Sequence, residues 1–345
     1  MSELKPSPVS ELRADVESIC LPHGRVVGSP GHLQTRRFLS QRLREIGCEP
    51  WRGGRFEMPY ADDARSFCNL AGVVRARNAG LAPLLVGAHY DSAIDAPCAD
   101  DNAAAVAIAL AVAGQVAESR PLERDLVVAL FDAEEPPYFC SPSMGSRRFW
   151  EDQRDDRPLH AAVIMDLVGH DVSIDGFGSE APESLRAALA PLLFMTGTES
   201  HPALRSVFGR AETVDGLRLV PTLNRYVGDM SDHGVFRENG VPYLFLSCGR
   251  WEHYHQPTDT PDRLNYEKMA RITRQVLAFA ASLDRVELPQ VGSEQFSETL
   301  DLEVSRLRLA LGAWLEPLLK LCGLDAVTSR AEMDRLVLTL LALGL

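Results

Sequence analysis

The sequence predicts an α/β protein, a three-layer sandwich in which helices flank a mostly parallel central sheet, with a helical extension at the C-terminus. Three observations lead to this prediction. Short apolar segments alternate with longer helical segments along most of the chain, as in parallel α/β proteins. Several short segments are continuously apolar, which is typical of strands covered on both faces. Beyond about residue 284, only helical periodicity remains.

The first segments give two helices. Residues 9–19 have an amphipathic pattern, and the loop 25–32 that follows is rich in turn-forming residues. Phe38, Leu39 and Leu43 then recur at helical spacing, and Gly47 provides a stop, so we expect a helix over 33–46. We expect His32, at the end of the loop, on the surface, because no carboxylate lies near it in sequence.

Strands and helices alternate after this point. The expected strands are 55–58, 67–74, 84–88, 125–131, 161–165 and 241–246. The expected helices are 103–117, a nearly uninterrupted run of helix formers, 182–195 and 261–283. In such sheets, ligands bind outside the carboxyl ends of the strands.

The C-terminal part has a different pattern. One helix is expected from the apolar residues that step by three and four, namely Leu300, Val304, Leu307, Leu311, Trp314 and Leu318, and another over 330–343. Leu302, Leu309 and Leu315 lie off this stripe, so the first helix is apolar on more than one side. We therefore expect a catalytic domain over 1–284 and a helical extension over 285–345, which packs on the main domain and offers a homo-oligomer contact.

Composition excludes several classes of partner. The formal net charge of -13 argues against nucleic acid, because phosphate binding needs clustered positive charge. No run approaches the roughly 18 consecutive apolar residues of a membrane span, and residues 1–11 lack the pattern of a signal peptide. The seven cysteines include no CxxC pair. These features lead us to expect a cytoplasmic protein with no membrane partner.

Acidic or histidine side chains stand at or just beyond four of the expected strands. The first strand contributes His89 and Asp91, which point to the same side of an extended backbone. The others are followed by Glu134-Glu135, by Asp166 and by the segment 252–260, which contains His255. Unpaired carboxylates at buried strand ends are costly, so four such ends at one sheet edge suggest a cation between them. Imidazole together with carboxylate favours zinc over magnesium or calcium.

The pattern also suggests roles for individual residues. A carboxylate at the start of the helix after the first strand end, from the pair Asp100-Asp101, is a candidate to bridge two zinc ions. Asp91 is placed to fix the tautomer of His89. Of the adjacent glutamates, Glu135 is the candidate ligand, whereas Glu134 is the candidate base that takes a proton from water.

Six segments resemble, in the same order, the motifs of co-catalytic zinc aminopeptidases, whose relatives include glutamate carboxypeptidase and glutaminyl cyclase. The segments are 87–92, 99–103, 131–135, 165–166, 231–233 and 255–260, so the resemblance covers roughly residues 25–284. It implies two Zn²⁺ ions bridged by Asp101 rather than Asp100. It further implies that His89 and Asp166 hold one ion, that Glu135 and His255 hold the other, and that the substrate is a peptide or an aminoacyl compound.

Two other interpretations of the same fold stay open. A glutaminyl cyclase, with one zinc, is suggested by Tyr60 with 65–70 and by 141–147, but Asp100-Asp101-Asn102 and Tyr254 differ from the cyclase pattern. A non-catalytic binding protein is disfavoured by the intact Glu134 and ligand set. Ser231-Asp232-His233 does not indicate a nucleophilic triad, since contiguous residues rarely face one another. We expect Asp232 and Tyr254 near the substrate instead.

Overall fold

The chain folds around one large mixed sheet. The computed structural model describes residues 9–62, 65–76, 80–119, 122–154, 157–173, 182–210, 213–289 and 298–342. Within them, a nine-stranded sheet has the order β1-β3-β5-β4-β6-β9-β7-β8, with β2 paired to β3. The strands are β1 Glu49–Pro50, β2 Glu57–Ala61, β3 Ser66–Val74, β4 Leu84–His89, β5 Leu126–Phe131, β6 Ala161–Met165, β7 Leu192–Thr196, β8 Arg218–Pro221 and β9 Tyr243–Ser247.

The parallel strands occupy the centre of the sheet. β5, β4, β6 and β9 run parallel to one another, as do β7 and β8. β1, β2 and β3 form antiparallel pairs on one side, and β7 is antiparallel to β9 on the other. The predicted α/β sandwich is confirmed, with the parallel arrangement limited to these strands.

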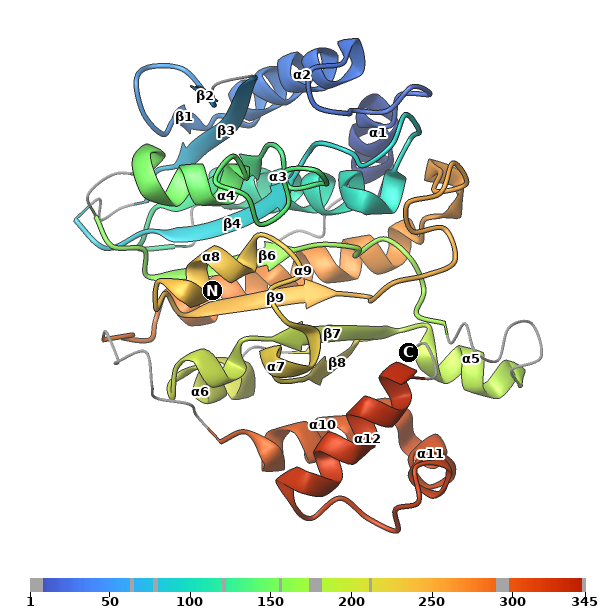
Figure 1. Cartoon of the computed structure of the whole chain (residues 1–345). Coiled ribbons are helices and arrows are strands. Elements are labelled where there is room, and N and C mark those ends of the chain that lie inside the picture. Colours follow the sequence, from blue (N-terminus) through green and yellow to red (C-terminus); the bar gives the residue numbers. More distant parts are fainter. Residues whose placement is uncertain are drawn as a thin grey trace.

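Helices cover both faces of the sheet (Figure 1). The longer ones, α1 Val9–Ile19, α2 Pro30–Ile46, α3 Ala104–Ser119 and α9 Tyr266–Leu283, pack together on one face, and α6 Leu204–Arg210 joins α9 there. The short helices α4 Gly145–Arg148 and α8 His233–Glu238 lie on the opposite face. Two large apolar clusters result, one on each side of the sheet.

The α3 helix is buried at the centre of the first layer. It contacts α1, α2 and α9 as well as β3, β4 and β5. Residues 99–119 are long and apolar enough to cross a membrane by composition alone, but 78% of the apolar window is buried inside the protein. Burial on all sides explains why α3 is apolar all round, as expected of a core helix.

Two predicted helices are wrong in part. The expected helix 182–195 is divided into α5 Glu183–Leu189 and strand β7, because Pro191 interrupts it and a short apolar run reads equally as helix or strand. The expected helix through 300–318 ends at Gly312, whose φ of 53° is left-handed, and splits into α10 Leu300–Leu311 and α11 Leu315–Leu321. Strand β8 was not predicted.

The C-terminal helices pack on the main sheet beside β8 (Figure 1). α10 contacts β8 and α5, and α12 Arg330–Ala342 follows α11. Packing against the same chain agrees with the expected position of the extension, whose predicted end at residue 343 lies outside the described residues. The domain boundary at 284 and the homo-oligomer contact stay predictions. Leu309, Leu321 and Leu338 are exposed on these helices.

Candidate metal centre

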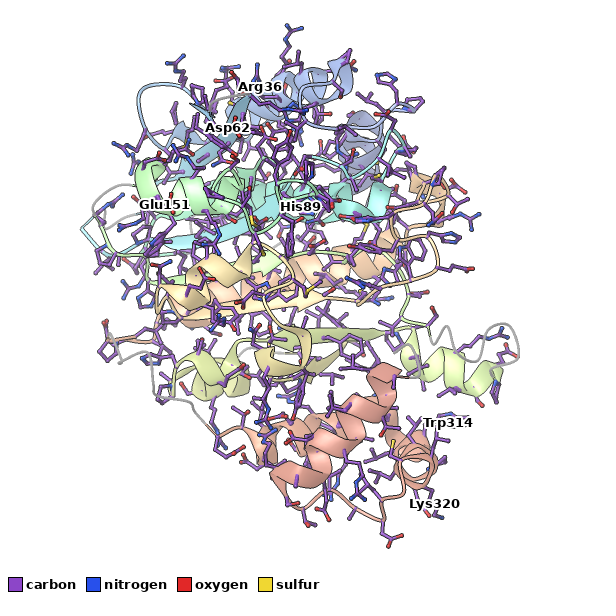
Figure 2. The ribbon with its side chains drawn as sticks, in the orientation of Figure 1. Arg36, Asp62, His89, Glu151, Trp314 and Lys320 are labelled. Carbon is purple, nitrogen blue, oxygen red and sulfur yellow. The ribbon has the colours of Figure 1, made fainter. Side chains whose placement is uncertain are left out.

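The candidate ligands lie at the carboxyl edge of the central strands. His89 ends β4, Glu134 and Glu135 follow β5, and Asp166 follows β6. These strands are parallel neighbours, so their carboxyl ends meet at one edge. Figure 2 shows His89 at the level of β4, in the upper half of the view.

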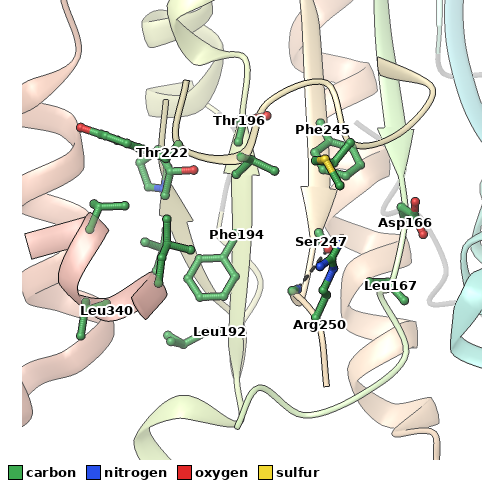
Figure 3. Close-up of a pocket in the computed structure, with 18 of the residues that line it drawn as sticks. Asp166, Leu167, Leu192, Phe194, Thr196, Thr222, Phe245, Ser247, Arg250 and Leu340 are labelled. Carbon is green, nitrogen blue, oxygen red and sulfur yellow. Dashed lines mark hydrogen bonds between the residues drawn. The ribbon is translucent and has the colours of Figure 1, made fainter. Parts of the chain in front are cut away.

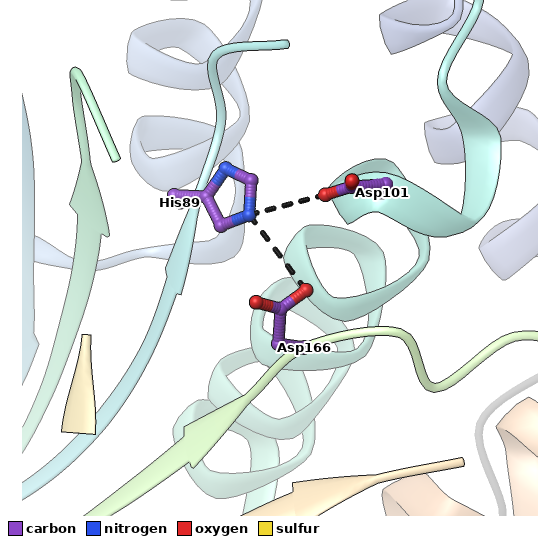
Figure 4. A group of neighbouring side chains, drawn as sticks. All are labelled: His89, Asp101 and Asp166. Carbon is purple, nitrogen blue, oxygen red and sulfur yellow. Dashed lines mark ion pairs between the residues drawn. The ribbon is translucent and has the colours of Figure 1, made fainter. Parts of the chain in front are cut away.

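Asp101 is shared by two groups of potential ligands. His89 Nε2 lies 3.3 Å from Asp101 Oδ1 and 3.7 Å from Asp166 Oδ1 (Figure 4). His255 Nε2 lies 3.1 Å from Asp101 Oδ2 and 3.2 Å from Glu135 Oε2. Each oxygen of one carboxylate therefore faces a different set of donors. The arrangement fits two metal ions, one per group.

Several ligand atoms in these groups are buried without a hydrogen-bond partner among the described residues. They are Nε2 of His89, Nε2 of His255, Oε1 of Glu135 and Oδ1 of Asp166. Buried polar atoms are normally paired, because an unpaired one costs roughly 1–3 kcal/mol. Buried ligand atoms that converge in this way form a site for a cation. The residues present therefore fit zinc, whose usual ligands are imidazole and carboxylate.

The raised pKa values of the carboxyl groups at the centre also favour a bound cation. Burial raises the pKa of Glu135 to about 8, assisted by the charge of Asp101. Burial likewise raises the pKa of Glu134 and of Asp166 above their ordinary values. Carboxyl groups that hold protons in this way lose them readily to a bound divalent ion. The carboxylates of Asp101 and Glu135, within 3.2 Å of its Nε2, raise the pKa of His255 to about 10.

Asp91 joins two of the strand ends. Its Oδ1 lies 3.3 Å from His89 Nδ1 and accepts a hydrogen bond from the backbone N–H of Glu134 at 3.1 Å. Its Oδ2 accepts from the N–H of Glu135, also at 3.1 Å. This fully buried carboxylate thus orients the imidazole and fixes the backbone of both glutamates. The predicted contact with His89 is present, and the contact with the glutamates was not foreseen.

Further residues hold Asp101 in place, and sequence reasoning assigned them no role. Asp259 accepts hydrogen bonds from the backbone N–H groups of Asp100 and Asp101. Asp100 points away from the centre, and its carboxylate accepts from Gly169 N and contacts His170 Nδ1, each at 2.6 Å. The only signal for Asp259 was its place in the segment that contains His255.

Arg25 supports the same loop from behind. It is fully buried and donates from Nε to Tyr90 O, from Nη1 to Pro97 O and from Nη2 to Cys98 O. A longer contact reaches the carbonyl of Asp101 at 3.3 Å. Nothing in the sequence marked this arginine, because its partners are backbone carbonyls more than 60 positions away.

The predicted surface position of His32 is wrong. His32 is 2% exposed, and its Nε2 lies 2.8 Å from Asp132 Oδ1. Asp132 also accepts from Cys68 N at 2.7 Å. The partner of His32 is 100 residues away in sequence, which is why no nearby carboxylate was visible.

Backbone conformation is unusual next to several ligands. Ala133, Leu167 and His255 have φ of 54–55°, in the left-handed region that non-glycine residues rarely adopt. Each of them is a ligand or flanks an acidic residue of the centre. Such conformations cost free energy and cluster at functional sites, where surrounding contacts enforce them.

Asp232 and Tyr254 lie beside the centre in different ways. Asp232 is buried, neither of its oxygens has a hydrogen-bond partner in the described parts of the chain, and burial raises its pKa to about 7. It is not among the residues that line the cavity described below. Tyr254 does line that cavity and stacks on His255 with ring centroids 3.9 Å apart.

His233 takes no part in a nucleophilic triad. Its Nε2 contacts Asn224 Oδ1 at 3.0 Å and Gly228 O at 3.2 Å, and its ring stacks on Phe245. Burial lowers its pKa to about 4. It is therefore a neutral structural histidine.

A cavity of about 740 Å³ opens beside the candidate ligands. Asp101, Glu134, Glu135, Asp166 and His255 line one end of it. Figure 3 shows the path away from Asp166, across Ser247 and Phe194, toward Leu340 of α12. A site of this size has room for a substrate next to the metal centre.

The fold and the paired ligand groups define an α/β protein with a candidate zinc centre. The sequence profile of peptidase family M28 matches residues 69–280. The chain belongs to this family.

One curated protein matches part of the sequence. Over 221 residues, which are 56% of this chain and 65% of the relative, the sequence is 29% identical to the uncharacterized protein YfbL of Escherichia coli (strain K12). The chain thus covers slightly less than two thirds of that protein.

Solved structures share the fold at low identity. LapB from Legionella pneumophila superposes with a TM-score of 0.62 and 18% identity over 81% of this chain and 73% of its own. A Zn-dependent exopeptidase from Parabacteroides distasonis superposes with a TM-score of 0.60 and 15% identity, over 80% of this chain and 98% of its own. A glutaminyl cyclase from Bacteroides thetaiotaomicron superposes with a TM-score of 0.62 and 15% identity, over 81% of this chain and 99% of its own.

Proposed function

We propose that this protein is an aminopeptidase that uses two zinc ions to remove N-terminal residues from peptides or aminoacyl amides. The observation that carries the proposal is the shared Asp101 carboxylate, with one histidine and one further carboxylate on each side of it. His89 and Asp166 would hold one ion, and Glu135 and His255 the other. Zinc supplies Lewis acidity when bound, which polarises a carbonyl and lowers the pKa of water toward roughly 7.

Glu134 is the proposed general base. Its Oε2 lies 3.9 Å from His89 Nε2, and the residue lines the cavity next to the ligands. Glu134 is not a member of either ligand group. Its carboxylate would take a proton from the attacking water and deliver it to the leaving amine. Asp91 would hold Glu134 in position through the backbone N–H.

The acidic residues around the cavity support a substrate with a free amine. Glu134, Glu135 and Asp166 line the end of the cavity where the scissile bond would lie. With Glu135 and Asp166 assigned to the ions, Glu134 is the carboxylate left at this end to accept a hydrogen bond from a substrate ammonium or amine group.

The first prediction tests the base. Glu134→Gln keeps the shape and volume of the side chain but cannot take a proton, so kcat should fall by about 10²–10⁴-fold. Zinc content, measured by atomic emission on dialysed protein, should stay at the wild-type value. Turnover of a panel of aminoacyl nitroanilides provides the readout, and a variant with wild-type kcat would remove Glu134 from this role.

A glutaminyl cyclase remains the second candidate, since cyclases share the fold. The two ligand groups support two ions rather than one. Zinc content near two per chain together with hydrolysis of nitroanilides would favour the peptidase. Zinc content near one together with cyclisation of an N-terminal glutaminyl peptide would favour the cyclase, and absence of zinc and of both activities would favour a binding protein.

A further inference from the structure

The cavity beside the metal centre extends along one face of the sheet. Phe194 and Thr196 are two positions apart in β7, so both point to this face of the sheet. The strand register places them opposite Ser247 and Phe245 of β9. Phe194 is also paired with Val220 of β8. All five residues line the cavity. The floor is therefore a continuous stretch of sheet that leads from the centre toward β8.

The C-terminal helices line the far end of the cavity. Leu307 and Leu311 of α10, together with Leu336 and Leu340 of α12, line the cavity there. Glu303 also lines it, but Arg330 and Thr299 bind its carboxylate oxygens, so no free charge is presented. The metal centre and the helical extension thus contribute opposite ends of one cavity.

The length of the floor exceeds what one small side chain needs. From β6, which precedes Asp166, the floor crosses β9 and β7 to β8, and three strand spacings amount to about 14 Å. An extended peptide of about four residues would span this distance at roughly 3.3 Å per residue. Either several residues or one long chain would therefore fill it.

The polar groups of the far part are too few for a peptide backbone. Each buried residue of a peptide brings one N–H and one C=O that need partners. Apart from the metal end, the lining offers few side-chain groups of this kind. The Arg250 guanidinium lies over the ring of Tyr254, and the Tyr226 hydroxyl donates to Asp334. The hydroxyls of Thr196 and Thr222 have no partner among the described residues, and Ser247 already accepts from Gly249 N. A hydrocarbon chain needs no such partners and gains by burial.

We propose that this cavity binds a long apolar side chain on the acyl half of the substrate, so that the enzyme prefers aminoacyl compounds with extended hydrocarbon side chains. The proposal rests on the aminopeptidase function proposed above. Its α-amine and scissile carbonyl would lie at the acidic end, and the chain would run over Phe194 toward Leu340 (Figure 3). The helical extension would then set the longest chain that fits.

A homologous series of nitroanilides tests this. The N-terminal residues would be 2-aminobutanoyl, 2-aminohexanoyl, 2-aminooctanoyl and 2-aminodecanoyl. For the wild-type holoenzyme, kcat/KM should rise by about threefold to fourfold for each added methylene that becomes buried. A kcat/KM that stays constant or falls as the side chain lengthens would overturn the proposal.

Substitutions in α12 test whether the far end of the cavity causes the dependence on chain length. Leu340→Trp fills the far end and should abolish the gain for the two longest substrates while sparing 2-aminobutanoyl. Leu340→Ala should improve the longest substrate relative to the others, which covers the case that the tryptophan variant fails to fold. Leu338→Trp is the matched control, because Leu338 is on the same helix but 58% exposed, and its profile should equal the wild type. Unchanged chain-length profiles in both Leu340 variants would overturn the proposal.

Two further measurements separate this inference from the proposed function. Binding of free 2-aminodecanoate to the holoenzyme, measured by calorimetry, should be weakened in Leu340→Trp and not in Leu338→Trp. If this holds but no aminoacyl substrate is hydrolysed, the cavity assignment stands and the aminopeptidase fails. If decanoyl nitroanilide, which lacks the amine, is cleaved as well as its 2-amino counterpart, the preference for a free amine fails while the chain-binding cavity stands. If free 2-aminodecanoate does not bind, or Leu340→Trp does not weaken it, the cavity assignment fails.

Discussion

Single side chains at the centre act through more than one contact, and Asp91 shows this most clearly. One of its oxygens contacts His89, and its two oxygens accept hydrogen bonds from the backbone N–H groups of Glu134 and Glu135. A residue that supports ligands in this manner influences metal affinity without contacting the metal.

Replacing Asp91 with Asn should therefore weaken zinc binding. The amide NH₂ of asparagine cannot accept a hydrogen bond, so the backbone N–H of Glu134 or Glu135 loses its acceptor. His89 also loses the carboxylate that faces its Nδ1. We expect the zinc dissociation constant to increase by about 10–100-fold, measured by competition with a chromophoric chelator. Asp95→Asn, an exposed change in the loop that follows, should leave the affinity unchanged. Wild-type affinity in Asp91→Asn would show that the contact is structural only.

A second residue-scale prediction concerns acid stability. Burial lowers the pKa of His233 to about 4, against an ordinary value of 6.5, so the unfolded state binds this proton more readily. The stability from a neutral His233 is complete above pH 6.5 and is lost as the pH falls toward 4. The loss amounts to roughly 3 kcal/mol at most.

His233→Phe isolates this contribution. Phenylalanine keeps the stacking on Phe245 but loses the hydrogen bond to Asn224, so the variant should be less stable than wild type at pH 7 by about 1–2 kcal/mol. That difference should shrink or reverse near pH 4.5. Urea unfolding of both proteins without metal, at several pH values, provides the measurement. A difference that is constant with pH would contradict the lowered pKa.

At the scale of elements, one buried ion pair fastens α12 to α10. Arg330 donates from Nη1 and Nη2 to the two oxygens of Glu303, each at 2.8 Å. Glu303 is 2% exposed. Removing the arginine leaves a buried carboxylate without its charge partner, which typically costs about 3–5 kcal/mol.

We therefore expect Arg330→Met to destabilise the C-terminal helices by several kcal/mol, measured by urea unfolding with hydrogen exchange on α12. Lys320→Met is the matched control, because Lys320 pairs with Glu316 across four residues of α11 and both side chains are exposed. Such surface pairs contribute about 0–1 kcal/mol. Equal effects of the two substitutions would show that the buried pair does not fasten the helices.

For the whole molecule, metal binding should couple directly to folding stability. The candidate ligands come from three strand ends and two loops, and they are brought together only in the folded chain. An ion that binds the folded state alone adds RT ln(1 + [L]/Kd), which is about 2.7 kcal/mol at a hundredfold excess over Kd.

Removing zinc with a chelator should thus lower the thermal midpoint, and adding zinc back should restore it. Calorimetry of the full chain measures both steps. Asp101→Asn, which impairs the shared ligand, should lose most of the zinc-dependent increase. A midpoint that does not respond to the chelator would contradict the assignment of a metal centre.

The sequence by itself determined the layered α/β fold and the set of residues at the carboxyl ends of the central strands. This was possible because continuous apolar runs report burial on both faces, and parallel strands bring their ends to one edge. The predictions were wrong where an apolar run was too short to distinguish a helix from a strand, as in 192–196. They were also wrong where a side chain contacts a partner that is distant in sequence, as for His32.

The family resemblance implied Asp101 rather than Asp100 as the shared ligand, but only the tertiary structure shows the physical reason. His170 and the backbone N–H of Gly169 turn the Asp100 carboxylate away from the centre, and Asp259 holds the backbone of Asp101. Only the tertiary structure decided that α10 and α12 line the far end of the cavity. Both outcomes depend on packing between segments more than 60 positions apart, which hydrophobic periodicity cannot encode.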